Sequence, residues 1–241
     1  MTVVQHLEEL RYRLVVTFGA VGVGAIVGWF LYEPVKQLMR DPFCTYVNRL
    51  PEAARPPAGC SLVFTGPLDA FLVKIKIVFF LGLFVALPIV LYQLWAFIVP
   101  GLTQRERRMA VPFVISSTFL FALGGALAYV TLPKGLGFLL GFAGEGVVPL
   151  ITFDRYMGFV VLVTIAFGLS FEFPIVLVFL EMAGVISSEK LRQWRRPAIL
   201  FIAIFAAVIT PSTDPYTMTA MMVPMFAFYE AAIIVGRLMK R

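Results

Sequence analysis

Three glutamates have side chains that could do chemistry in this largely apolar chain: Glu9, Glu106 and Glu172. A carboxylate accepts the planar guanidinium fork of arginine through two parallel hydrogen bonds, which the ammonium group of lysine cannot copy. Glu9 and Glu106 fall in two polar segments that we expect on one membrane face, so together they could clamp two neighbouring arginines of a ligand. Glu172 falls within an apolar run, where a carboxylate is costly unless it is paired, neutral or hydrated.

Each glutamate also has a structural interpretation. Glu9 and Arg13 are four residues apart, so they could form a salt bridge within one helix, worth only a few tenths of a kcal/mol at a wet surface. Glu106 could pair with the arginines beside it in the chain. Glu172 could be a protonated acid bonded to a backbone carbonyl that Pro174 leaves without a donor.

Motifs for catalysis or for metal binding do not occur in the sequence. Its single histidine is His6, and it has no HExxH, no GxSxG, no Cys/His metal spacing and no Walker glycine loop. We therefore expect neither an enzyme nor a resident cofactor or metal.

The composition is that of a membrane protein. Hydrophobic residues make up 60% of the chain and charged residues 14%, with a mean hydropathy of +0.91, whereas soluble domains are about 45–50% apolar and about 25% charged. The net charge of +6 comes from short basic clusters between apolar runs, which is the positive-inside pattern. It does not indicate a nucleic-acid partner, because no basic stripe alternates with aromatic residues.

The predicted fold is all-α: one membrane domain, 1–241, of six transmembrane helices. Residues 1–13 form an amphipathic cytoplasmic segment, because Val3, Leu7, Leu10 and Leu14 share one helical face. A long periplasmic loop covers residues 33–71. The predicted spans are residues 14–32, 72–98, 109–132, 156–184, 197–210 and 217–236.

The last two spans are predicted to be short for the bilayer, the fifth most clearly. Its strongly apolar part, Ala198–Ile209, has 12 residues, or about 18 Å of helix at 1.5 Å per residue. A typical hydrocarbon core is about 30 Å thick, so this helix requires a thinner bilayer or shelter by its neighbours. The turn after it contains Asp214, whose surroundings indicate a turn-forming residue.

The basic residues predict that both termini are cytoplasmic. With the N-terminus inside, twelve Lys and Arg residues fall inside and eight outside, and six of those eight belong to the long first loop. We do not expect a cleavable signal peptide, since the first apolar run is long and no small-residue cleavage site follows it. Cys44 and Cys60 share the first outside loop, so they could form a disulfide or remain free thiols.

Several motifs resemble the TatC family of bacterial twin-arginine protein translocases, in family order along the chain. They are His6-Leu-Glu-Glu-Leu-Arg11, the second-span end from Leu91 to Leu102, Glu106-Arg107-Arg108, Phe167-Gly-Leu-Ser-Phe-Glu-Phe-Pro174, and Thr210-Pro211 with Asp214. The last turn departs from the family form by one extra residue. The resemblance implies a glove-like bundle with a concave side in the bacterial inner membrane, working with the proton gradient and no nucleotide.

The resemblance also implies a receptor for Arg-Arg signal peptides of folded cargo. Glu9 and Glu106 would meet the peptide arginines, while Arg11, Phe97, Arg107 and Arg108 would shape the same surface. Glu172 would face the concave side, and Pro42 and Asp214 are further functional positions. The implied partners are single-span Tat subunits of the TatA/TatB type along the fifth and sixth helices, other copies of the chain, and membrane lipid.

A second hypothesis is a proton-coupled transporter of small solutes with Glu172 as its proton site. Such a transporter commonly has two repeated halves with broken helices at matching places. The sequence shows no such repeat, and a transporter has no need of acids at the cytoplasmic edge.

Overall fold

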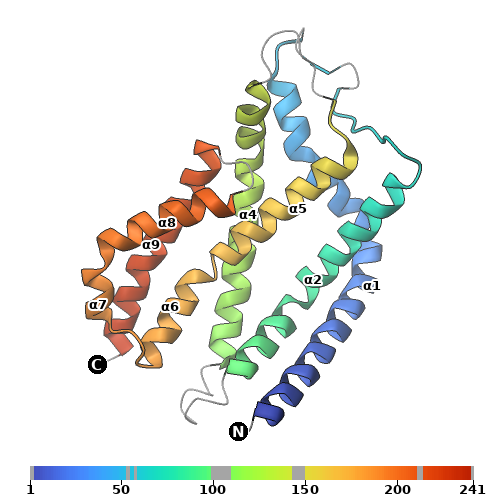
Figure 1. Ribbon diagram of the computed structural model, residues 1–241. Helices are drawn as coiled ribbons and strands as arrows, with labels where there is room; N and C mark the ends of the chain where they lie inside the picture. The colour runs from blue at the N-terminus through green and yellow to red at the C-terminus, as the bar shows by residue number, and fades with distance from the viewer. Residues whose placement is uncertain are drawn as a thin grey trace. The chain divides into compact units, whose positions relative to one another are not determined.

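The structure is a computed structural model that describes residues 3–52, 55–56, 59–98, 110–142, 150–210 and 214–239. This part of the chain is built from helices (Figure 1), with an isolated β-bridge between Val63 and Thr152, and the predicted all-α class is confirmed. The helices are α1 (Val3–Arg49), α2 (Asp69–Ile98), α4 (Ala110–Gly141), α5 (Phe153–Ser170), α6 (Phe173–Met182), α7 (Ser188–Gln193), α8 (Arg195–Ile209) and α9 (Pro215–Met239).

Helix α1 is much longer than the predicted first span. It includes the N-terminal amphipathic segment, as expected for residues 3–13, and it continues to Arg49. The predicted loop from residue 33 is therefore wrong over residues 33–49. The prolines in this stretch suggested a loop, but Met39, Phe43 and Val47 recur every four residues and are each at most 5% exposed. Burial of this apolar stripe favours the helix despite the prolines.

The fourth span consists of two helices, α5 and α6, separated at Phe171 and Glu172. The backbone N–H of Phe171 donates to the carbonyl of Phe167 at 3.0 Å, and the N–H of Glu172 donates to that of Leu169 at 3.1 Å. Pro174 lies in the first turn of α6, where the missing N–H of proline costs nothing. The sequence predicted the position of the span and not this interruption.

The last two helices differ in length. Helix α8 has 15 residues, about 22 Å at 1.5 Å per residue, so the predicted shortness of the fifth span is confirmed. Helix α9 has 25 residues, about 37 Å, so the predicted shortness of the sixth span is wrong. The helix itself begins at Pro215, before the predicted start at residue 217, and continues to Met239, beyond the predicted end at residue 236.

Among the described residues, five helices are long and apolar enough to cross a membrane. They are α1, α2, α4, the combined α5–α6 and α9, and α8 is the candidate for a sixth crossing. The six-span count and the cytoplasmic location of both termini remain predictions.

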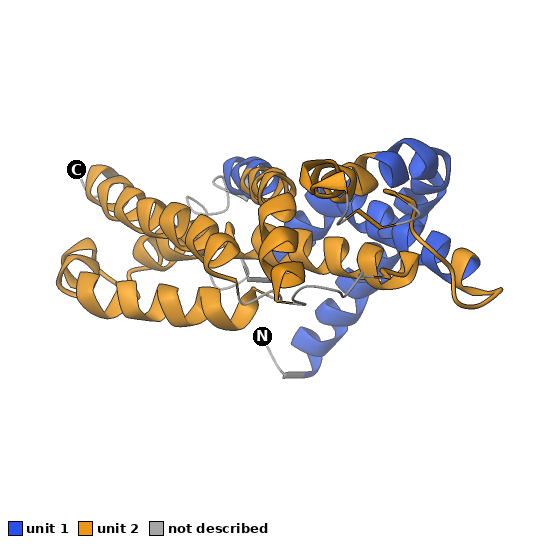
Figure 2. Cartoon of the chain, turned by 90° about the horizontal axis from the view of Figure 1, so that it is seen from above, with its two compact units in different colours: residues 1–37, 71–119 blue, residues 38–70, 120–241 orange. Residues whose placement is uncertain are grey.

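The chain forms two compact units, residues 1–37 with 71–119 and residues 38–70 with 120–241 (Figure 2). In unit 1, α1 and α2 pack closely at glycines. A Cβ added to Gly82 would lie 2.7 Å from the backbone nitrogen of Ala25 and 2.8 Å from the carbonyl oxygen of Val21. Small residues at such crossings allow backbones to approach each other, as is common between membrane helices.

In unit 2, the C-terminal part of α1 is joined to α5 through Tyr156. The Tyr156 ring is buried against Phe43, with ring centroids 5.4 Å apart, and its hydroxyl donates to the carbonyl of Met39 at 2.8 Å. Helix α9 packs against α6, α7 and α8. By the bounds of the two units, Glu9 and Phe97 belong to unit 1, and Pro42, Glu172 and Asp214 belong to unit 2.

Candidate functional site

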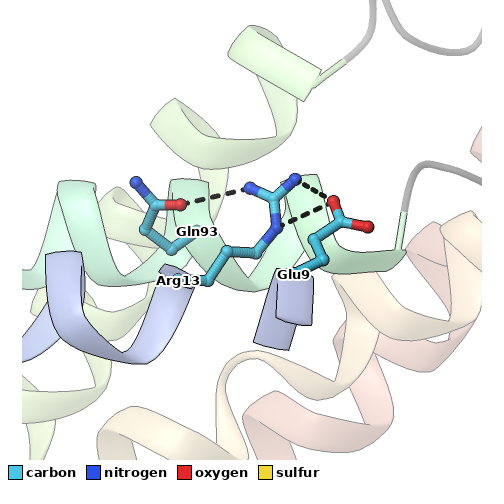
Figure 3. A network of polar contacts seen from close by, with 3 residues as sticks. All are labelled: Glu9, Arg13 and Gln93. Atoms are coloured by element: carbon cyan, nitrogen blue, oxygen red, sulfur yellow. Dashed lines mark hydrogen bonds and ion pairs between the residues drawn. The ribbon is translucent and has the colours of Figure 1, made fainter. Parts of the chain in front are cut away.

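Glu9 belongs to a polar network between α1 and α2 in unit 1 (Figure 3). Arg13, one turn further along α1, donates from Nε to Glu9 Oε1 at 3.1 Å, and its Nη2 pairs with the same oxygen. The Nη1 of Arg13 donates to Gln93 Oε1 on α2 at 3.1 Å. The predicted salt bridge between Glu9 and Arg13 is confirmed, and Gln93 holds its arginine in place.

This network uses only one oxygen of the Glu9 carboxylate. Oε2 of Glu9 is buried and has no hydrogen-bond partner among the described residues. A carboxylate oxygen shielded from water without a donor carries a free-energy cost that an incoming donor would relieve. Glu9 is thus held in one orientation by Arg13 and keeps an acceptor for a second cation.

Phe97 lies beside this network through a contact with His6. The two rings stack with centroids 4.5 Å apart and an interplanar angle of 24°. The N-terminal turns of α1 and the last turn of α2 therefore place His6, Glu9 and Phe97 together. Phe97 was predicted for this surface, whereas the part played by His6 was not.

Sequence reasoning also missed Gln93. Two features of the sequence could have indicated Gln93. It is a polar residue in an apolar span, and it lies four residues before Phe97, on the same face of the helix. A buried amide in a membrane helix needs a partner, and Arg13 provides it.

The other residues predicted for this surface form no described contact with the Glu9 network. Arg11 is exposed and forms no hydrogen bond or ion pair with a described residue. Glu106, Arg107 and Arg108 lie outside the described residues. The helices on either side of that segment meet in unit 1, because the rings of Trp95 on α2 and Phe113 on α4 lie 4.8 Å apart.

The acids of unit 2 have separate surroundings. Glu172 lies at the break between α5 and α6 and is partly exposed. Asp214 is fully buried and caps α9: its Oδ1 accepts from the backbone N–H of Thr217 at 2.8 Å. The turn-forming role predicted for Asp214 is thus seen as a helix cap.

Glu181, on α6, is an intramembrane acid that the sequence reasoning overlooked. It is 4% exposed, and neither carboxylate oxygen has a hydrogen-bond partner among the described residues. Its carboxylate lies against the backbone of Gly236 on α9, a place that only a glycine leaves open. The signal for Glu181 was present, since an acid in an apolar run is costly wherever it occurs.

The two cysteines are free thiols in this structure. The Sγ of Cys44 lies 3.8 Å from the carbonyl oxygen of Cys60, so the two residues are neighbours. The disulfide stays a prediction, and we expect it to form in an oxidising compartment, where a bond between neighbouring thiols is favoured. Thiol labelling of intact membranes should be weak until reductant is added, and full labelling without reductant would contradict the bond.

Comparison with known proteins gives a consistent result. The family model described as "Sec-independent protein translocase protein (TatC)" matches residues 5–224. A TatC protein of Frankia casuarinae is 44% identical over 248 residues, which cover 100% of this chain and 67% of that protein. A TatC protein of Aquifex aeolicus is 35% identical over 244 residues, covering 100% of this chain and 97% of that one.

A solved structure also matches. The crystal structure titled "Twin Arginine Translocase Receptor- TatC" superposes with a TM-score of 0.74 at 34% identity, covering 98% of this chain and 100% of that one. The long apolar helices and this likeness define a multi-pass helical protein of the inner membrane that acts in protein transport.

The chain belongs to the TatC family of Sec-independent protein translocases. This is a family of translocase proteins and not of enzymes. The comparisons give no support to the second hypothesis, a transporter of small solutes.

Proposed function

We propose that the chain is the receptor core of the twin-arginine export system and binds Arg-Arg signal peptides of folded proteins at the end of unit 1 that carries Glu9. The observation that carries this proposal is the half-used carboxylate of Glu9, held by Arg13 and Gln93 beside the ring of Phe97. A guanidinium can donate to the remaining oxygen, and Phe97 offers an apolar face to the neighbouring peptide residue.

The second acid of the proposed clamp is Glu106. Phe97 lies beside the Glu9 network, and the Trp95–Phe113 contact joins the helices that precede and follow residues 99–109. These contacts support our placing Glu106 at the same end of unit 1 as Glu9. Arg11, Arg107 and Arg108 would complete the surface, and both termini would lie on the cytoplasmic side.

The proposal extends to the partners that assemble for transport. We propose that single-span subunits of the TatA/TatB type dock along α8 and α9, and that copies of the chain associate, with transport driven by the proton gradient. In support, α9 carries an apolar hollow of about 570 Å³ near its N-terminal end, which includes Tyr216 and Val223. Glu172, Pro42 and Asp214 are proposed to act in transport after peptide binding.

The direct test compares a twin-arginine signal peptide with its Lys-Lys variant by crosslinking to the purified protein. We expect strong capture of the first and weak capture of the second, because lysine cannot form the bidentate pair. Equal capture of both peptides would overturn the clamp.

Replacing the acids should weaken the same peptide while the bundle stays folded. We expect Glu9→Gln and Glu106→Gln each to reduce affinity by about tenfold to a hundredfold, the range for a hydrogen bond to a charged group of about 1.5–3 kcal/mol. The matched control is Glu8→Gln, an exposed neighbour on α1. A loss of affinity in Glu8→Gln equal to that in Glu9→Gln would show a general charge effect and not a clamp.

A further inference from the structure

A pocket of about 600 Å³ lies in unit 2 where α7 meets the C-terminal end of α9. This volume is within the range of pockets that hold small ligands. Polar side chains from the start of α7 form one side, and α9 contributes both apolar and basic side chains. The lining residues are Ser187, Ser188, Glu189, Arg192, Ile234, Arg237 and Leu238.

The pocket carries two cations without acidic partners. Arg192 and Arg237 are both exposed, and neither forms an ion pair with a described residue. Nearby, Arg195 on α8 does have one, since its Nη2 lies 2.5 Å from Glu230 Oε2 on α9. With Glu189 included, the lining has two positive charges and one negative charge, a net charge of +1 that matches a phosphodiester monoanion.

The pocket also has an apolar side and a hydroxyl without a partner. Ile234 and Leu238, one turn apart on α9, are 57% and 65% exposed. Ser188 is only 4% exposed, and its hydroxyl has no hydrogen-bond partner among the described residues. Most buried polar groups in proteins are hydrogen-bonded. A polar ligand in the pocket that reaches Ser188 would give its hydroxyl the hydrogen-bond partner that it lacks among the described residues.

A free anion would use the arginines and leave Ile234 and Leu238 uncovered. A molecule with a phosphate at one end and hydrocarbon at the other would contact both kinds of side chain. The pocket lies at the end of the long apolar helix α9, which is where a membrane-crossing helix meets the headgroup layer. Basic pockets at this depth are suited to anionic lipid headgroups.

We propose that this pocket binds one anionic phospholipid. Its phosphate lies between Arg192 and Arg237, within reach of the hydroxyl of Ser188, and its acyl chain runs along Ile234 and Leu238. The guanidinium groups donate to the phosphate oxygens. The site joins α7 to α9 within unit 2 and shares no residue with the Glu9 surface of unit 1, so it stands whether or not the proposed peptide binding does.

The test is native mass spectrometry of the full chain in detergent, titrated with phosphatidylglycerol. We expect a one-to-one complex that weakens about fivefold in Arg192→Gln or Arg237→Gln, and about 25-fold in the double variant, given about 1 kcal/mol for each basic residue at an anionic membrane surface. The control is Arg196→Gln on α8, an exposed arginine that does not line the pocket. All these side chains are exposed, and unchanged thermal unfolding would show that the variants fold.

Three further arms decide what the pocket recognises. Phosphatidylcholine should bind far more weakly, since its headgroup has no net charge. Leu238→Ser should weaken phosphatidylglycerol and leave the response to inorganic phosphate unchanged. The proposal is overturned if the double variant binds phosphatidylglycerol like the parent, if phosphatidylcholine binds equally well, or if inorganic phosphate alone binds as tightly as the lipid.

Discussion

We expect Gly124→Val to cause the largest loss of stability among the single changes considered for this chain. A Cβ at Gly124 on α4 would lie 2.6 Å from the carbonyl oxygen of Phe167 and 3.0 Å from the Cα of Gly168, both on α5. These are backbone atoms, which cannot rotate away as a side chain can, so the two helices would have to separate. Overpacking costs about 1–3 kcal/mol of stability and occasionally more. Because the collision is with the backbone of the partner helix, we expect this variant to lose about 3 kcal/mol or more in the free energy of unfolding.

Two other glycines, one next to Gly124 on α4 and one on α5, provide a graded comparison. A Cβ at Gly125 would meet only the Cγ2 of Thr164, at 3.3 Å, and one at Gly158 would meet nothing within 4 Å. We therefore expect Gly125→Val to have a small effect and Gly158→Val to leave stability unchanged. Thermal unfolding in detergent, followed by circular dichroism, measures all three. Equal unfolding of the Gly124 and Gly158 variants would show that valine itself, and not the helix contact, is responsible.

Replacing Asp214 with alanine should give the second large loss of stability, in α9. Asp214 is fully buried, and its carboxylate accepts from both the backbone N–H and the hydroxyl of Thr217, itself only 2% exposed. Alanine removes the helix cap, worth about 1–2 kcal/mol. It also removes the acceptor from buried donors, which costs about 1–3 kcal/mol. The capped N–H is one of these donors, so the two costs overlap, and we expect a total loss of about 2–4 kcal/mol in the free energy of unfolding.

Asp214→Asn separates this structural role from a role in transport. The asparagine side-chain oxygen can still accept from the Thr217 N–H, so unfolding should change much less than in the alanine variant. If Asp214→Asn folds like the parent and also transports cargo, the residue acts as a cap alone. If it folds normally and transport stops, the charge itself is required. Similar stability of the alanine variant and the parent would contradict the capping role.

The sequence by itself determined that this is a helical membrane protein, because apolar runs of membrane length have to satisfy their backbone groups internally. It also located most helices to within a few residues, and its motifs indicated the family. The weakest prediction was the stretch 33–49, where local proline signals suggested a loop. Burial of Met39, Phe43 and Val47 favoured helix there, and burial is a property of the folded chain.

Only the tertiary structure decided how the acids are used. The spacing of Glu9 and Arg13 predicted their salt bridge, but the partnership of Arg13 with Gln93 joins residues 80 positions apart. In the same way, the stacking of His6 on Phe97 and the placement of Glu181 against Gly236 depend on which helices pack together. Helix periodicity determines which residues share a face, whereas the partner of that face is chosen by packing between segments far apart in the chain.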